Sequence, residues 1–455
     1  MCKTTRRGFL MGCSTAIAGL AGARFSNLAF ADTNGGNNDE LLVIIFLRGG
    51  MDGLNVVLPI DGSDRGFYET ARPNIAVPLT GPNAALPINA QFGFHPAMSP
   101  LVNLYQDNKL SLIHAVGHDD VGRSHFDAME QIELGTPGTV SSTTGWLTRH
   151  VQSANNLPPD IVMPSLAVGN LQPTSLLGDY DAVNMEDVGQ FNLETGPYMW
   201  RDAQRLALRH LYEGDSTWLH VSGVQALDAA DIIELNVAGG YTPSNGAVYP
   251  SSSFGEHLRT VAQMVKLGLG LRVATIDLGG WDTHNGQGND GGGYFAGLLG
   301  ELAAGMEAFY LDLDGSGANN YTSKMTTVVK SEFGRRLTQN ADNGSDHGHG
   351  NLMMVMSGNA TGGVHGTWPG LDNGQLYDGA DLAVTTDFRQ ILAEILIRRM
   401  GNPRLGVVFP GYQGYAPLGV VSGTDLPPDY SAGQILFEDD YESGDLSAWS
   451  SAVTG

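Results

Sequence analysis

The sequence predicts an α/β protein, a three-layer α/β/α sandwich with a mostly parallel central sheet. Residues 40–47 (ELLVIIFL) contain a continuous apolar run that is rich in branched side chains and shows no alternation with polar residues. This pattern is typical of strands buried on both faces of a parallel sheet. In the C-terminal half, such runs alternate with helical patterns, which favours a sheet built from right-handed crossovers.

Each element of this fold has its own local signal. Apolar runs bounded by glycine, asparagine or charged residues predict the strands, and apolar residues at helical spacing predict the helices. The expected strands are residues 40–47, 109–116, 271–278, 325–330 and 352–357. The expected helices are residues 95–105, 124–134, 198–212, 228–235, 254–269, 294–311 and 388–399.

The charge of the chain excludes two classes of partner. The formal net charge is −24, and the first 31 residues carry four basic residues and no acidic one, so the remainder has 20 bases against 48 acids. A surface with this excess of acid repels nucleic acid and anionic lipid. Cys2 and Cys13 both lie in the first 31 residues, so the remainder offers no disulfide, thiol nucleophile or sulfur ligand.

The first 31 residues read as a twin-arginine signal peptide. Residues 5–10 (TRRGFL) precede an apolar run, and residues 29–31 (AFA) form an A-x-A cleavage site. The run is too short for a stable membrane span. We therefore expect the twin-arginine export machinery as a partner and a periplasmic or secreted protein.

The remaining chain reads as one main domain with an appendage. Residues 32–425 carry the α/β pattern, and residues 136–253 within it are either a cap or an insertion. Residues 426–455 are strongly acidic and read as a C-terminal tail.

Acidic and histidine residues follow several predicted strands. Because the carboxyl ends of parallel strands meet at one edge of a sheet, these side chains are expected to converge there. Carboxylate and imidazole ligands without sulfur suit zinc, manganese or iron and, with more carboxylates, magnesium or calcium. We expect two divalent metal ions, held by Asp52, Asp282, His284, Asp346, His347 and His349.

Two further residues are candidates for catalysis. Ser124 lies at a predicted helix start, where free N–H groups favour an oxyanion, although an N-cap serine explains the position equally well. Arg335, with Glu332, follows a predicted strand and either contacts an anion or ligand residues or forms a surface salt bridge. Three residues near Ser124 are alternative ligands: His118, His125 and Asp127.

Five motifs in order resemble a known family. They are residues 47–55 (LRGGMDGLN), 124–129 (SHFDAM), 280–284 (GWDTH), 331–335 (SEFGR) and 346–350 (DHGHG). Together they resemble the domain of unknown function 1501 family, within the alkaline phosphatase and sulfatase superfamily. The resemblance covers residues 40–410 and implies an alkaline-phosphatase-like fold.

The resemblance also implies roles for single residues. Asp52, Asp346 and His347 match one metal site, and Ser124 matches the nucleophile. Asp282 and His284 match part of a second metal site, whose third ligand is His349 or His365, with His349 favoured. The chain departs from the superfamily here, because the usual Asp-x-x-x-His spacing is Asp-x-His. It also lacks the Cys/Ser-x-Pro-x-Arg motif of typical sulfatases.

These inferences give a functional expectation. The chain is expected to be an exported metal-dependent hydrolase of phosphate or sulfate esters, with a small anionic ester as substrate. Ser124 would attack the ester and Arg335 would hold the oxyanion. The alternative is a catalytically inactive metal-binding or structural protein on the same fold.

Overall fold

A computed structural model describes the chain between residues 38 and 431. Its gaps are residues 119–121, 139–141, 158–160, 162, 180, 189–197, 215–219, 221–222, 225–226, 229, 232 and 235–239. The predicted signal peptide and most of the acidic tail lie outside the described residues, as do parts of the predicted cap, including residues 229, 232 and 235 of the predicted helix 228–235.

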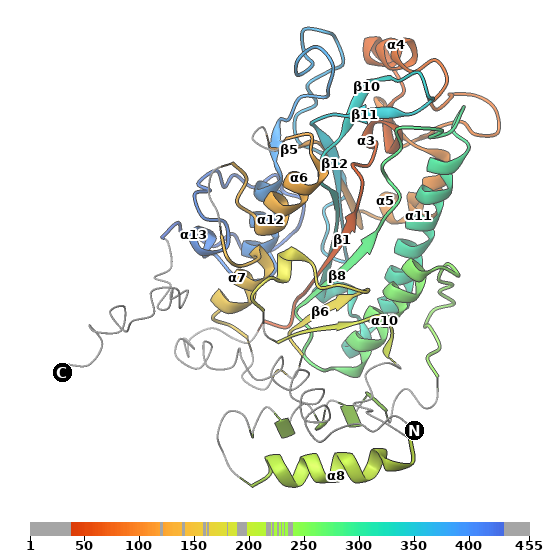
Figure 1. The fold of residues 1–455 in the computed structure, drawn as a ribbon. Coiled ribbons are helices and arrows are strands. Elements are labelled where there is room, and N and C mark those ends of the chain that lie inside the picture. The colour runs from red at the N-terminus through yellow and green to blue at the C-terminus, as the bar shows by residue number, and fades with distance from the viewer. Residues whose placement is uncertain are drawn as a thin grey trace.

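A large sheet runs through the centre of the molecule (Figure 1). Within the described residues it has nine strands, eight of them in the order β13-β5-β12-β9-β1-β8-β6-β7, with β14 paired to β5. The strands are β1 (Leu41–Leu47), β5 (Leu110–Gly117), β6 (Ser165–Val168), β7 (Ala182–Met185), β8 (Val273–Leu278), β9 (Met325–Ser331), β12 (Asn351–Ser357), β13 (Gly363–His365) and β14 (Thr386–Asp387).

The sheet is mostly parallel, as the apolar runs predicted. β1 pairs in parallel with both β8 and β9, which places the ends of these three strands side by side. β12 is antiparallel to both of its neighbours, β9 and β5. The five predicted strands are present within one or two residues of their expected bounds.

Both faces of the sheet are covered by helices. Leu41, Val43 and Ile45 of β1 join a core with α10 and α11, whereas Leu42 and Ile44 join a second core with α6, α7 and α12. A strand buried on both faces needs no polar alternation, which explains the unbroken apolar run in the sequence. The mixed α/β class is thus confirmed.

Six predicted helices, residues 95–105, 124–134, 198–212, 254–269, 294–311 and 388–399, are present close to their expected bounds, whereas α3, α4, α7 and α13 were not predicted. The helices near the sheet are η1 (Pro96–Leu101), α5 (Val102–Gln106), α6 (His125–Leu134), α7 (Trp146–Ser153), α10 (Ser253–Leu267), α11 (Tyr294–Leu313), α12 (Phe388–Arg398) and α13 (Leu405–Val408). The others are α3 (Gly53–Val56), α4 (Gly62–Ala71), η2 (Thr174–Leu176), η4 (Tyr198–Trp200), α8 (Arg201–Tyr212), η5 (Gly317–Asn319) and η6 (Thr322–Lys324).

The described residues also form two small sheets, and the hairpin of residues 335–347 lies near the top of Figure 1. One contains β2 (Val57–Pro59), β3 (Leu86–Pro87) and β4 (Phe92–Phe94). The other is the antiparallel pair β10 (Arg335–Gln339) and β11 (Ser345–His347), in which Arg335 lies opposite His347. This hairpin brings the end of β9 and the residues before β12 together.

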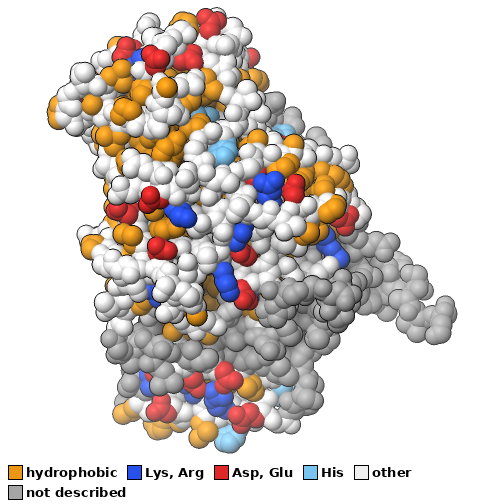
Figure 2. Space-filling model, turned by 180° about the vertical axis from the view of Figure 1, so that it is seen from behind, with side chains coloured by type: hydrophobic (Ala, Val, Ile, Leu, Met, Phe, Trp, Pro, Cys, Tyr) orange, Lys and Arg blue, Asp and Glu red, His pale blue; other side chains and the backbone are white. Residues whose placement is uncertain are grey.

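Two surface properties of the described part agree with the sequence. None of its helices has the length and apolar character needed to cross a membrane. On the face shown in Figure 2, Lys and Arg side chains lie among Asp and Glu side chains, without forming a continuous basic patch.

Candidate metal centre

The candidate centre lies where β1, β8 and β9 end. The loop after β1 approaches the loop after β8 so closely that a side-chain carbon at Gly49 would lie 2.4 Å from the backbone nitrogen of Asp282. Gly49 also has a φ of 123°, which favours glycine. The glycine therefore allows these two strand ends to meet without a side chain between them.

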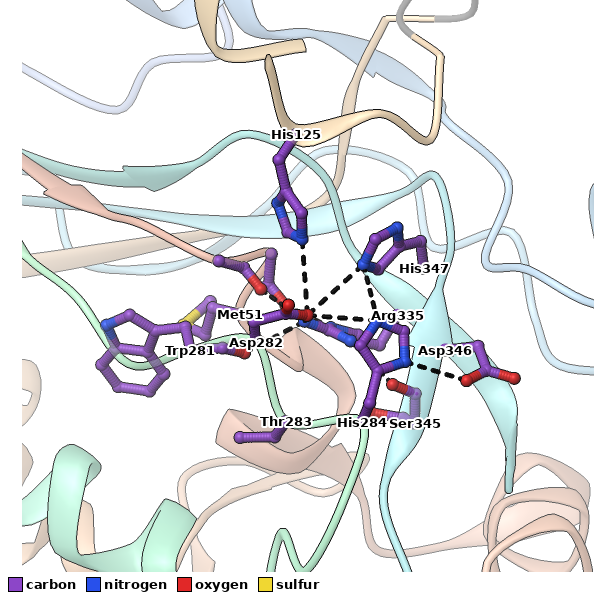
Figure 3. A network of polar contacts seen from close by, with 12 residues as sticks. Met51, His125, Trp281, Asp282, Thr283, His284, Arg335, Ser345, Asp346 and His347 are labelled. Carbon is purple, nitrogen blue, oxygen red and sulfur yellow. Dashed lines mark hydrogen bonds and ion pairs between the residues drawn. The ribbon is translucent and has the colours of Figure 1, made fainter. Parts of the chain in front are cut away.

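Asp282 is the central residue of the site (Figure 3). Its Oδ1 lies 3.2 Å from Nε2 of His284, 3.3 Å from Nε2 of His347 and 3.4 Å from Nε2 of His125. The Nε2 atoms of His284 and His347 are 2.8 Å apart. One carboxylate and three imidazoles from three parts of the chain therefore converge: the loop after β8, the start of α6 and the end of β11.

The other ring nitrogen of each histidine contacts an oxygen acceptor. Nδ1 of His125 lies 2.7 Å from Oε1 of Glu332, and Nδ1 of His284 lies 3.0 Å from Oδ1 of Asp346. Nδ1 of His347 lies 2.8 Å from the backbone oxygen of Arg123. An oxygen acceptor at Nδ1 fixes the proton there and leaves a lone pair on Nε2, as in histidines that bind metals.

This arrangement fits a cation at the point where the Nε2 atoms meet. Lone pairs on His284 and His347 at 2.8 Å repel each other unless a proton or a cation lies between them. Nε2 of His125 is buried without a hydrogen-bond partner. A tetrahedral ion with bonds of about 2.0–2.1 Å separates its ligand atoms by about 3.3 Å, which matches the three distances to Asp282.

The charges around the site keep Asp282 ionised. Burial raises the pKa of Asp282, but the hydrogen bond and charge of Arg335, together with His284 and His125, outweigh burial and hold the pKa at about 2. The hydrogen bond that His125 donates to Glu332 raises the pKa of His125. Burial lowers the pKa of His347, which favours its neutral form.

Arg335 has a different place from the one predicted. Its side chain is fully buried, and Nη2 lies 2.7 Å from Oδ1 of Asp282. Nε and Nη1 donate to the backbone oxygens of Gly50 and Ser345 at 2.6 and 2.7 Å. All three guanidinium nitrogens are thus used within the protein, so Arg335 fixes Asp282 and joins three loops. Contact of Arg335 with a substrate oxyanion stays a prediction, because the guanidinium contacts in the structure are all internal.

Asp52 also differs from its predicted role. It is fully buried, and Arg72 contacts both carboxylate oxygens at 2.6 and 3.0 Å. Nε2 of Gln287 donates to Oδ2 at 2.7 Å. A carboxylate paired in this way anchors the loop after β1. The structure does not bring Asp52 into the group around Asp282.

The structure separates His349 from His347. Nδ1 of His349 lies 2.8 Å from Oδ2 of Asp381, which also accepts a hydrogen bond from Nε of Arg123 at 3.1 Å. His365, the other candidate for the third ligand, contacts the backbone oxygen of Gly362 at 2.7 Å through its Nε2. Neither histidine joins the group around Asp282, so the predicted second site is not assembled from these residues.

Ser124 is the N-cap residue of α6, as predicted from the helical pattern. It is exposed, and its side chain makes no capping hydrogen bond. It directly precedes His125 and therefore lies beside the centre. Two other candidates lie apart, since His118 contacts Arg389 and Asp127 is exposed in the first turn of α6.

Sequence reasoning ranked two residues of the site too low. His125 was only an alternative ligand, and Glu332 was expected to contact an anion or ligand residues or to form a surface salt bridge. The sequence signal that could have identified His125 was the helical pattern that begins at Ser124. This pattern places His125 in the first turn of the helix, next to the strand ends. Asp346 proves to contact the Nδ1 atom of His284, on the side away from Asp282.

Among the described residues, one set of acidic and histidine side chains has its ligand atoms close enough to hold one metal ion: His125, Asp282 and His347, whose atoms lie within 4.8 Å of one another. His284 lies outside this set, although its Nε2 is 3.2 Å from Oδ1 of Asp282. The structure thus brings together one candidate set of ligands among the described residues.

The comparison with protein families matches the region that contains most of these residues. Residues 249–402 match the family described as Protein of unknown function (DUF1501). This match supports the DUF1501 resemblance that the sequence motifs indicated. The DUF1501 match includes Asp282, His284 and His347, while His125 lies before it. Nothing matches among curated proteins or among solved structures.

Proposed function

We propose that this protein is an exported, metal-dependent hydrolase of phosphate or sulfate esters with an alkaline-phosphatase-like fold. The observation that carries the proposal is the convergence of three Nε2 atoms on Oδ1 of Asp282, each from a histidine whose Nδ1 is held by an oxygen. Arg335 already neutralises Asp282, so the need for a further proton or cation comes from the Nε2 atoms of His284 and His347, which lie 2.8 Å apart. The same arrangement is what a metal centre requires.

The donor set favours one ion of a particular kind. Three nitrogen donors and one carboxylate suit zinc, manganese or iron better than magnesium or calcium, which prefer oxygen. His125, Asp282 and His347 would hold the ion, with His284 as a further nitrogen donor beside Asp282. When bound, it would supply positive charge that stabilises the developing charge of an ester undergoing hydrolysis.

The surrounding residues position this group and an anionic substrate. Glu332, Asp346 and the backbone oxygen of Arg123 orient the three imidazoles. Two arginines beside the centre keep part of their side chains exposed, with 33% of Arg123 and 42% of Arg336 accessible. They are better placed than Arg335 to contact a phosphate or sulfate group.

Ser124 is the proposed nucleophile. Its hydroxyl is exposed at the start of α6, next to the ligand His125. Attack by its Oγ on phosphorus or sulfur would form an ester bond to the serine as the bond to the leaving alcohol breaks. The alcohol takes up a proton, and water then releases phosphate or sulfate and restores the serine.

Hydrolysis by the purified exported chain tests the proposal. We expect zinc or manganese to support phosphate or sulfate release from aryl esters and a chelator to abolish it. Ser124→Ala is expected to remove turnover and leave bound metal unchanged. Full turnover in Ser124→Ala would contradict the nucleophile assignment. A metal-loaded chain that hydrolyses neither aryl ester would contradict the function.

One observation favours a second candidate, a binding or structural protein of the same fold without catalysis. Asp52 and Arg335, which the resemblance and the sequence placed in catalytic roles, are both used in internal bonds. The same assay decides between the two, because this alternative predicts bound metal without turnover.

A further inference from the structure

A buried side-chain amide links two segments that carry candidate ligands. Gln287 is 1% exposed and lies in the same loop after β8 as Asp282 and His284. Its Oε1 accepts a hydrogen bond from Oγ1 of Thr283 at 3.0 Å and another from Oγ of Ser345 at 2.9 Å. One oxygen atom therefore holds the loop after β8 against strand β11.

The two hydroxyl groups belong to residues that stand close to ligands in the chain (Figure 3). Thr283 lies between Asp282 and His284, and Ser345 lies two residues before His347. Thr283 and Ser345 are both buried, so solvent does not compete for their hydroxyls. The backbone N–H of Ser345 also donates to the backbone oxygen of Thr283 at 3.1 Å. A shift of either hydroxyl would therefore move a ligand with it.

The distance between the two segments matters for a bound ion. Oδ1 of Asp282 comes from one segment and Nε2 of His347 from the other, and these atoms lie 3.3 Å apart. The segments approach so closely that a side-chain carbon at Gly344 would lie 2.2 Å from the backbone oxygen of His284. Metal sites keep their bond lengths within about 0.2 Å, so a small displacement of one segment weakens binding.

The other end of the Gln287 amide is tied to a buried charge. Nε2 donates to Oδ2 of Asp52 at 2.7 Å, and Arg72 contacts both carboxylate oxygens of Asp52. An ionised carboxylate only accepts hydrogen bonds, which fixes the nitrogen of the amide on this side and the oxygen on the other. Arg72, Asp52 and Gln287 thus connect the loop after β1 with both ligand segments.

We propose that Gln287 is a positioning residue of the metal centre. It fixes the segments that carry Asp282 and His347 relative to each other, and it joins them to the buried Asp52. Asp52 acts through Gln287 and does not contact the ion. The inference rests on the metal centre of the proposed function, but it does not depend on which ester is hydrolysed.

The substitution Gln287→Glu tests this role with little change in shape. Glutamate keeps an oxygen for the two hydroxyls, but it places a carboxylate oxygen where Nε2 now donates to Asp52. We expect the affinity for zinc, titrated against a chelator of known affinity, to fall at least about tenfold, as for other residues behind metal ligands. The visible absorption spectrum of the cobalt-loaded chain, which depends on ligand geometry, should change as well.

A control separates positioning from a loss of stability. Asn402 is also a buried amide, and its Nδ2 donates to Oγ of Ser153 at 2.9 Å and to the backbone oxygen of His150 at 3.2 Å. None of these partners is a candidate ligand. Asn402→Asp should lower the free energy of unfolding in urea and leave the zinc affinity within about twofold of the original.

A double variant tests the contact with Asp52 itself. Asp52→Asn combined with Gln287→Glu exchanges the donor and the acceptor and keeps one buried carboxylate near Arg72. This exchange should restore the zinc affinity to within about threefold of the original chain. The recovery would show that the single variant fails through this contact and not through misfolding.

The possible outcomes separate this role from the proposed function. Unchanged zinc affinity in Gln287→Glu would overturn the positioning role and leave the metal centre standing. An equal loss in Asn402→Asp, or a loss that the double variant does not restore, would overturn it in the same way. An original chain that binds no zinc, manganese or iron would refute the metal centre, and with it both the role of Gln287 and the proposed function.

Discussion

Replacing Glu332 with glutamine probes how the protein orients a ligand of the centre. Glu332 has a fully buried side chain, and Oε1 lies 2.7 Å from Nδ1 of His125. Oε1 also accepts the backbone N–H of Gly49 at 2.8 Å. Glutamine has nearly the same shape and keeps an oxygen acceptor, so Glu332→Gln removes mainly the negative charge behind the imidazole.

The expected effect is on metal affinity rather than on folding. Loss of the residue that orients a ligand typically lowers metal affinity 10–100-fold, which corresponds to about 1.4–2.8 kcal/mol. Because Glu332 is buried, solvent does not screen its effect on His125, so a loss toward the upper end is expected. Titration of zinc against a chelator of known affinity measures the change directly.

A matched control separates orientation from loss of a buried charge. Glu133 is also buried and also forms an ion pair, 2.7 Å from Arg48, but its partner is not a ligand of the centre. Glu133→Gln should leave zinc affinity within about twofold. The reasoning is refuted if Glu332→Gln binds zinc as tightly as the original chain, or if both variants lose affinity equally.

Three further predictions follow from buried or titratable groups. Burial lowers the pKa of Lys330 from 10.5 to about 7. Between pH 7 and 10.5, Lys330 is therefore protonated in the unfolded chain and neutral in the folded chain. Stability should therefore rise from pH 7 to 10.5, and Lys330→Met should raise the melting temperature most at pH 7 and little near pH 10.5. Arg72→Met leaves the buried Asp52 carboxylate without its partner and should lower the free energy of unfolding, measured with urea, by about 3–5 kcal/mol. A smaller loss would contradict the pairing. Zinc affinity should fall as the pH drops, beginning above the ordinary histidine value of 6.5, because Glu332 raises the pKa of His125. Asp282, with a pKa of about 2, stays ionised throughout, so affinity independent of pH would rule out the histidine ligands.

The sheet was predictable because local signals and burial agree. β1 is apolar on both faces, and its alternate residues enter two different cores. The strand ends follow from the same runs, so the sequence also indicated that Asp282 and His347 meet at one edge. Helix periodicity further located the start of α6 at Ser124.

The partners of single charged residues were less predictable. Asp52 stands at a strand end like a ligand, but Arg72, twenty residues later, pairs with it. His349 is two residues from His347, yet its hydrogen-bond partner is Asp381, which lies on a different loop. Such pairings depend on where long side chains meet in space, and no spacing in the sequence records them.

Metal content per chain tests the central claim most directly. Elemental analysis of the purified exported chain should find about one zinc, manganese or iron ion per chain. His347→Ala should lose nearly all of it, whereas His349→Ala, two residues away, should keep it. A chain without bound metal would contradict the centre around Asp282. Two ions per chain, one of them lost in His349→Ala, would instead support the two-site arrangement predicted from the sequence.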